Sequence, residues 1–230
     1  MACTEHGCLR GRTVPDFRTV TTVQIRPVGA SALLVDLADE GTPETVESWR
    51  AEIWRRRADG EFDAVDIVPG ARTVLVDGVT DPTELTDRLA LWAPPIGATF
   101  APGTLVDIPI RYDGPDLPMV AKLWGVSEES VIARHRATEF RVAFCGFAPG
   151  FAYMTGLPTG FAVPRLDTPR TRVPAGSVAL ADTYCGIYPR PSPGGWLLIG
   201  RTDAVLFDPD REPPALLTPG TRVRFIAVAR

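Results

Sequence analysis

The chain has 230 residues, of which 45% are hydrophobic and 23% charged, and its formal net charge is −4. This length suits one large domain or two small ones, and the composition is that of a globular protein, which excludes a disordered polymer. The acidic balance argues against a binder of nucleic acid or of anionic membranes, and no apolar run approaches the roughly 18 residues of a membrane span.

Residues 1–20 show no sustained hydrophobic periodicity and are expected to form a mobile N-terminal extension. They lack the apolar core of a secretory signal, so we expect a cytoplasmic protein with reduced thiols. The extension holds Cys3, His6 and Cys8, but no second Cys/His pair follows at a zinc-site spacing. No metal site is predicted.

Residues 21–101 are predicted to form a small α+β domain with the element order ββαββα. Its two helices have clear start signals, because Thr42 before Pro43 and Asp81 three residues before Glu84 are typical of N-caps. Apolar residues of the first helix are all expected in the core, namely Val46, Trp49, Ile53 and Trp54. The expected strands are Val23–Val28, Ala32–Leu37, Phe62–Val68 and Thr73–Val76.

Residues 102–230 are predicted to form a second domain, a β-barrel or sandwich, after a proline-rich linker. The stretch from Cys145 to Gly220 holds 10 glycines and 12 prolines, yet its apolar runs are spaced like strands joined by tight turns. Short helices are expected over Asp116–Leu123 and Ser127–His135. The expected strands are Leu105–Tyr112, Phe140–Phe144, Val178–Leu180, Trp196–Ile199, Val205–Phe207 and Val223–Val228.

The glycine- and proline-rich segments of this second domain are candidate binding loops. Each one alone reads as an ordinary turn, but together they predict several rigid loops that converge into a cleft. Arginines on or beside them favour an anion site, against the alternative of a solvated surface. These arginines are Arg165, Arg170, Arg172, Arg190 and Arg201.

His135 is the one histidine of the expected folded region, and two roles are open for it. It is a candidate general acid or base, since its ordinary pKa lies near neutrality, or a helix C-terminal residue favoured by the helix dipole. Ser177 and Ser192 do not lie in a Gly-x-Ser-x-Gly motif, so serine catalysis is disfavoured.

The loop motifs make the chain resemble the allophanate hydrolase subunit 1 family, also called the KipI family, which includes the B-type subunit of bacterial 5-oxoprolinase. The resemblance covers roughly residues 23–228. It rests on Ile25-Arg-Pro-Val-Gly-Ala-Ser-Ala-Leu-Leu-Val35, His135, Gly146-Phe-Ala-Pro-Gly-Phe151, Thr168-Pro-Arg-Thr-Arg-Val-Pro-Ala-Gly-Ser-Val178, Gly186-Ile-Tyr-Pro189, Ser192-Pro-Gly-Gly-Trp196 and Ile199-Gly-Arg-Thr202.

The resemblance implies a small α+β N-terminal domain followed by a cyclophilin-like β-barrel, which agrees with the residue patterns. It implies a homologous subunit 2 (the C-type subunit of 5-oxoprolinase) as partner, joined by the A-type subunit, and the ATP-dependent opening of 5-oxoproline to glutamate. Positions in the matching motifs are expected to hold an anion or a developing negative charge, namely Arg170, Arg172, Arg201, Gly194 and Gly195.

ATP, with Mg, is expected in the assembled complex and without a P-loop, because no Gly-x-x-x-x-Gly-Lys-Ser/Thr motif occurs in the chain. One alternative is half of a biotin-dependent urea or amide carboxyltransferase. This chain has no biotinylation motif, so the biotin carrier would be another chain or domain. A second alternative is a KipI-type inhibitor of a histidine kinase.

Overall fold

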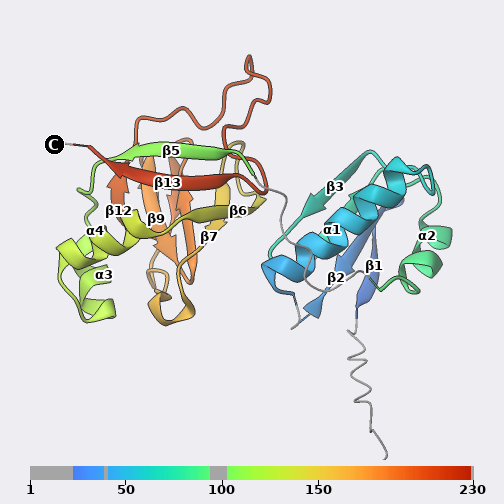
Figure 1. Cartoon of the computed structure of the whole chain (residues 1–230), viewed down its shortest axis with the longest axis horizontal. Helices are drawn as coiled ribbons and strands as arrows, with labels where there is room; N and C mark the ends of the chain where they lie inside the picture. The colour runs from blue at the N-terminus through green and yellow to red at the C-terminus, as the bar shows by residue number, and fades with distance from the viewer. Residues whose placement is uncertain (1–22, 39–40, 94–102, 229–230) are drawn as a thin grey trace, which may run out of the picture.

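The computed structural model describes residues 23–38, 41–93 and 103–228, which contain a four-stranded, a seven-stranded and a two-stranded sheet. Figure 1 shows the arrangement of the helices and strands. The predicted extension over residues 1–20, its cysteines, and the predicted domain boundary at residue 101 lie outside the described residues. No helix in the described part of the chain is long and apolar enough to cross a membrane.

The first sheet is antiparallel, with the strand order β1-β2-β4-β3, and it is accompanied by two helices. The predicted order ββαββα is confirmed, although β3 begins at Asp66 rather than at Phe62. The elements are β1 (Gln24–Val28), β2 (Ala32–Asp36), α1 (Pro43–Ala58), β3 (Asp66–Pro69), β4 (Thr73–Asp77) and α2 (Pro82–Leu89).

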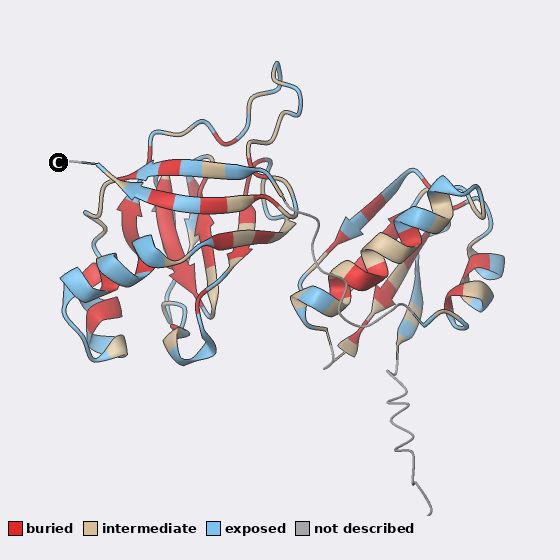
Figure 2. Ribbon diagram, in the orientation of Figure 1, coloured by how far each residue is buried: buried red, intermediate tan, exposed pale blue. Residues whose placement is uncertain are grey.

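Both predicted N-caps are confirmed, since the side chains of Thr42 and Asp81 accept hydrogen bonds from the backbone N–H groups of Thr45 and Glu84. The core prediction for α1 holds for Val46, Trp49 and Ile53 but is wrong for Trp54, which is 52% exposed. Each helical residue turns by about 100°, so Trp54, directly after Ile53, lies off the buried stripe of the helix. Figure 2 shows buried and exposed stretches alternating along α1.

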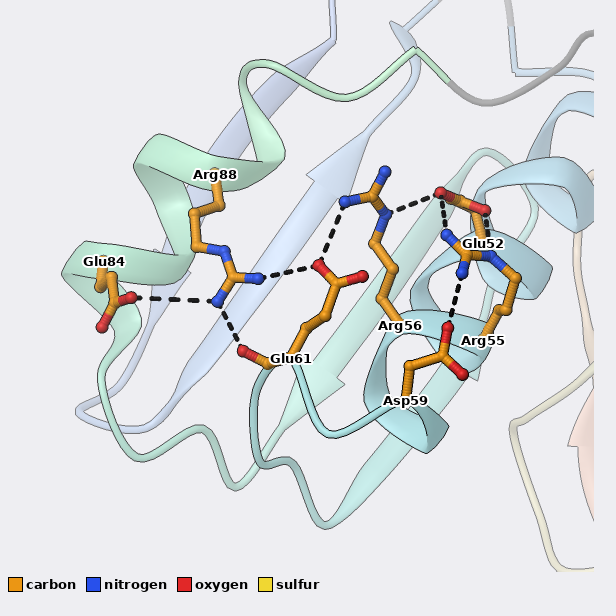
Figure 3. A network of polar contacts seen from close by, with 7 residues as sticks. All are labelled: Glu52, Arg55, Arg56, Asp59, Glu61, Glu84 and Arg88. Atoms are coloured by element: carbon orange, nitrogen blue, oxygen red, sulfur yellow. Dashed lines mark hydrogen bonds and ion pairs between the residues drawn. The ribbon is translucent and has the colours of Figure 1, made fainter.

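A chain of ion pairs links the two helices of this first sheet (Figure 3). Arg56 and Arg88 both contact the carboxylate of Glu61, at 3.2 and 2.9 Å. At its other end, Glu52 binds Arg55 and Arg56, which lowers the pKa of Glu52 to about 2. Because these side chains are partly or largely exposed, water screens the pairs and each contributes little to folding stability.

The second sheet has seven strands in the order β12-β9-β10-β7-β6-β13-β5. Only β13 and β5 run parallel, and the other pairs are antiparallel. Its strands are β5 (Leu105–Ile110), β6 (Phe140–Cys145), β7 (Ala152–Thr155), β9 (Ser177–Ala181), β10 (Tyr184–Ile187), β12 (Leu197–Arg201) and β13 (Arg222–Ala227). A separate two-stranded sheet pairs β8 (Arg170–Val173) with β11 (Ser192–Gly194).

The two edges of the seven-stranded sheet meet and nearly close it into a barrel. Arg111, directly after β5, exchanges two backbone hydrogen bonds with Arg201 at the end of β12, at 2.9 and 2.8 Å. Further along, the N–H groups of Gly114 and Asp116 donate to carbonyls of β12. The predicted fold class, a small α+β domain followed by a barrel, is confirmed.

Helices α3 (Leu117–Trp124) and α4 (Glu128–Ala137) and the short 3-10 helix η2 (Thr159–Phe161) complete the second unit. The strand predicted over Val205–Phe207 is wrong, because this segment forms only an isolated bridge between Phe207 and Ala215. Residues 206–208 make only two backbone hydrogen bonds with residues 214–216, and the carbonyls of Val205 and Leu206 also accept hydrogen bonds from the guanidinium of Arg211.

His135 lies in the core of the barrel and is completely buried. Its Nδ1 faces the hydroxyl of Tyr112 at 2.8 Å, its Nε2 faces the thiol of Cys185 at 3.5 Å, and its ring packs on Phe140 and Phe225. Burial lowers the pKa of His135 from 6.5 to about 3, so the ring is neutral in the folded protein at neutral pH.

We expect the burial of His135 to make the protein acid-sensitive. Below pH 6.5, the pKa of a histidine in the unfolded chain, His135 becomes protonated in the unfolded chain but stays neutral in the folded chain. The free energy of unfolding therefore decreases as the pH falls. Between roughly pH 7.5 and pH 5 the loss is about 2 kcal/mol, measured by urea unfolding. A His135→Gln variant should show a flatter dependence, whereas an equal slope in both proteins, or a His135 ring that titrates above about pH 5 by NMR, contradicts this account.

Candidate functional site

The predicted loops converge on an aromatic pocket on the outer face of the barrel sheet. Along β9, Val178 and Leu180 face the barrel core, while Ala179 and Ala181 face a second cluster that contains the pocket residues. Because these alanines are small, large rings pack closely over the strand. The pocket has a volume of about 100 Å3 and is lined by Phe147, Phe151, Tyr153, Arg165, Tyr188, Pro193, Gly194, Gly195 and Trp196.

Phe151 is the centre of the aromatic packing. Its ring meets Trp196 and Tyr188 edge to face, with centroids 5.5 and 5.4 Å apart, and it lies 5.0 Å from the ring of Tyr153. Edge-to-face contacts at these distances add about 0.5–1.5 kcal/mol each beyond the area they bury. The pocket walls are therefore held rigidly before any ligand arrives.

Two glycines are required by this packing. A Cβ atom at Gly186 would lie 2.9 Å from both the Phe151 and the Trp196 ring, and one at Gly194 would lie 2.2 Å from the hydroxyl of Tyr188. Any side chain at either position would displace an aromatic wall. Gly186 and Gly194 therefore leave space for the aromatic rings. The glycine-rich motifs have this role in addition to their predicted role as turns.

Phe147 sits at the pocket rim in a strained backbone conformation. Its φ angle is +67°, and the N–H of Ala148 donates to the carbonyl of Gly146 at 2.7 Å, which closes a three-residue turn centred on Phe147. Such a turn is rare, and a bulky residue there costs on the order of 1–3 kcal/mol. The turn leaves the Phe147 ring 58% exposed and in edge contact with Phe151 and Tyr188.

Arg165 is the cation of the pocket. Its guanidinium lies 5.9 Å from the centroid of the Trp196 ring, and its charge acts on the hydroxyls of Tyr153 and Tyr188. Burial raises the pKa of both hydroxyls, so both remain protonated hydrogen-bond donors at neutral pH. Among the described residues, no carboxylate forms an ion pair with Arg165.

Arg170, which is predicted to contact an anionic ligand, instead binds groups of the protein. Its guanidinium binds the buried carboxylate of Asp116 at 2.7 Å and reaches the carbonyl of Trp196 at 3.5 Å. The second oxygen of Asp116 accepts the backbone N–H of Leu198 at 2.7 Å. Arg170 therefore fixes the strand that carries Trp196 from behind the pocket.

The remaining predicted site residues are not all brought together. Gly194 and Gly195 line the pocket, whereas Arg172 is an exposed residue of β8 and is not part of the lining. Arg201 pairs with Asp113 near the barrel closure, and His135 lies inside the barrel. The anion role of Arg172 and Arg201 and the acid–base role of His135 stay predictions.

The aromatic walls were missed as site residues, although their signal is visible in the sequence. Aromatic residues recur within the glycine- and proline-rich motifs, although a simple turn does not require a large ring. An interpretation of these motifs as turns alone does not predict the pocket.

The coupling between Arg170 and Asp116 is expected to be strong. Replacing either residue with alanine leaves the other charge partly or fully buried without its partner, at a cost of about 3 kcal/mol of folding stability. The double variant should lose clearly less than the sum of the two single losses, as measured by urea unfolding of all four proteins. Purely additive losses would show that the pair is not coupled.

The strain at Phe147 is tested by a matched pair of substitutions. Phe147→Ala and Phe147→Gly both remove the ring, but only alanine keeps a Cβ at positive φ. We expect the glycine variant to be more stable by about 1 kcal/mol in urea unfolding. A more stable alanine variant would contradict the strained turn.

Comparison with known proteins identifies relatives over most of the chain. The family model described as "Carboxyltransferase domain, subdomain C and D" matches residues 23–217. A relative from Escherichia coli O157:H7, named as the B-type subunit of 5-oxoprolinase, is 38% identical over 208 residues, which cover 86% of this chain and 93% of the relative. One of the same name from Haemophilus influenzae is 39% identical over 212 residues, covering 89% and 97%.

Solved structures agree with the fold. TTHA0988 superposes with a TM-score of 0.70 and 34% identity over 90% of this chain, which spans 41% of the length of that chain. Kluyveromyces lactis urea amidolyase superposes with a TM-score of 0.66 and 19% identity, over 90% of this chain and 15% of that chain, and this shows a shared fold. The resemblance deduced from the loop motifs is confirmed, and the chain belongs to the family of carboxyltransferase domain, subdomain C and D, proteins.

Proposed function

We propose that this chain is the B-type component of an ATP-dependent 5-oxoprolinase, which opens 5-oxoproline to glutamate together with partner subunits. The observation that carries the proposal is the match to two proteins that bear the name of this 5-oxoprolinase component, at 38% and 39% identity over nearly the full length of each. The aromatic pocket supports it, because its motifs supply a preformed small-molecule site.

The word subunit in the names of both relatives supports the partner proposal. In it, this chain works with a homologous subunit 2, which is the C-type subunit, and with the A-type subunit, and it has little activity alone. ATP and Mg act as substrate and counter-ion in the assembled complex.

Within this proposal, the chain holds and orients the substrate. In it, the protonated hydroxyls of Tyr153 and Tyr188 donate hydrogen bonds to the substrate, and we assign the backbone N–H groups of Gly194 and Gly195, two further lining residues, to developing negative charge. The predicted acid–base role of His135 is not used in this proposal, because its ring is completely buried in the barrel core and is not part of the pocket lining.

One observation favours a second candidate, a biotin-dependent carboxyltransferase half acting on urea or a similar amide. The matching family model is itself described as a carboxyltransferase domain. This reading ranks second because the relatives that cover 86% and 89% of the chain, at 38% and 39% identity, carry the 5-oxoprolinase name, whereas urea amidolyase is 19% identical. No described feature specifically supports kinase inhibition.

The deciding experiment measures glutamate release from 5-oxoproline and ATP by purified A-type and C-type subunits, with and without this chain. We expect release to depend on adding the chain, and ATP consumption to depend on 5-oxoproline. A known B-type subunit serves as the positive control. Release by the control complex but not with this chain would contradict the proposal, and biotin-dependent carboxylation of urea would then favour the second candidate.

A further inference from the structure

The aromatic pocket is shaped for one small flat ring. Four aromatic walls, Phe147, Phe151, Tyr188 and Trp196, surround a cavity of about 100 Å3. A protein cavity of about 150 Å3 takes benzene, so the volume of this pocket matches a five-membered ring better than a purine base.

Charge at the mouth selects a ring that carries an anion. The aromatic faces repel negative charge, because their quadrupole is negative at the face, so an anionic group of the ligand must stay outside the cage. Arg165 lines the same pocket and has no ion pair with a described carboxylate, in contrast to Arg170, which Asp116 occupies. Arg165 is thus the cation available for a carboxylate at the mouth.

The pocket also offers polar groups at its wall. Tyr153 and Tyr188, which carry hydroxyl groups, and Gly194 and Gly195, which carry no side chains, all belong to the lining. A ligand with a carbonyl on its ring finds hydrogen-bond donors there, whereas a hydrocarbon ring would leave these groups unpaired.

We propose that the aromatic pocket binds 5-oxoproline itself, with the five-membered lactam against the rings of Phe147, Phe151 and Trp196 and the carboxylate on Arg165. This proposal deepens the proposed function. It rests on that function for the choice of 5-oxoproline among small cyclic carboxylates. It assigns substrate binding to this chain within the complex. The strained turn at Phe147 has its use here, because it holds the ring that forms the outer wall of the cage.

The test is calorimetric titration of the full-length chain with 5-oxoproline and two partial analogues. 2-Pyrrolidinone keeps the lactam and lacks the carboxylate, and glutamine keeps the carboxylate and lacks the ring. We expect 5-oxoproline to bind most tightly. Arg165→Ala should weaken 5-oxoproline binding about tenfold or more and leave 2-pyrrolidinone unchanged, since only the first ligand loses a charged hydrogen bond.

Phe147→Ala should weaken both cyclic ligands, and it is a safe substitution because the ring is largely exposed. Lys122→Ala is the matched control, since it removes an exposed positive charge that is not part of the pocket lining. Equal affinity of wild type, Arg165→Ala and Phe147→Ala for 5-oxoproline overturns the proposal, as does a lack of binding. Binding of a proline-containing peptide at this pocket in place of 5-oxoproline overturns it as well.

The binding titration and the turnover assay test the two proposals independently. If the Arg165→Ala and Phe147→Ala variants release glutamate in the complex with an unchanged KM for 5-oxoproline, the proposed function is supported and substrate binding at this pocket is contradicted. If the chain binds 5-oxoproline with the expected pattern among the variants but supports no glutamate release, the binding site is supported and the proposed function is contradicted.

Discussion

The barrel depends on one long-range contact, the backbone pairing between Arg111 and Arg201 that joins the two sheet edges. An open sheet leaves a row of unpaired backbone groups at each edge, and closure satisfies them. The approach is possible because Gly200 and Gly114 carry no side chains. A Cβ at either position would lie within 2.4 Å of the backbone of the opposite segment.

The same closure reaches the candidate site through Asp116. The segment after β5 runs along β12 until the carboxylate of Asp116 accepts the Leu198 N–H on one oxygen and binds Arg170 on the other. Arg170 belongs to β8, which pairs with β11, and this small sheet carries the glycine wall of the pocket. Barrel closure, the buried ion pair and the pocket wall therefore form one connected arrangement.

The site combines rigid apolar walls with one cation that the protein leaves without a carboxylate partner among the described residues. Other arginines of this unit do pair with carboxylates, as Arg111 does with Asp203 and Arg224 with Asp107. Holding Phe147 at positive φ costs stability, and such strain persists where the surrounding packing enforces it. A preformed cage of this kind lowers the ordering cost of binding a small rigid ligand.

Local patterns in the sequence were sufficient for the elements, the two N-caps, the order ββαββα and the family, because hydrophobic period and cap chemistry act within a few residues. They were misleading at Trp54, where one extra residue turns the side chain off the core stripe, and at Val205–Phe207, whose carbonyls bind Arg211. Only the tertiary structure decided which arginine is free for a ligand. Asp116 lies 54 positions before Arg170, and no local pattern records that this carboxylate neutralises Arg170 and not Arg165.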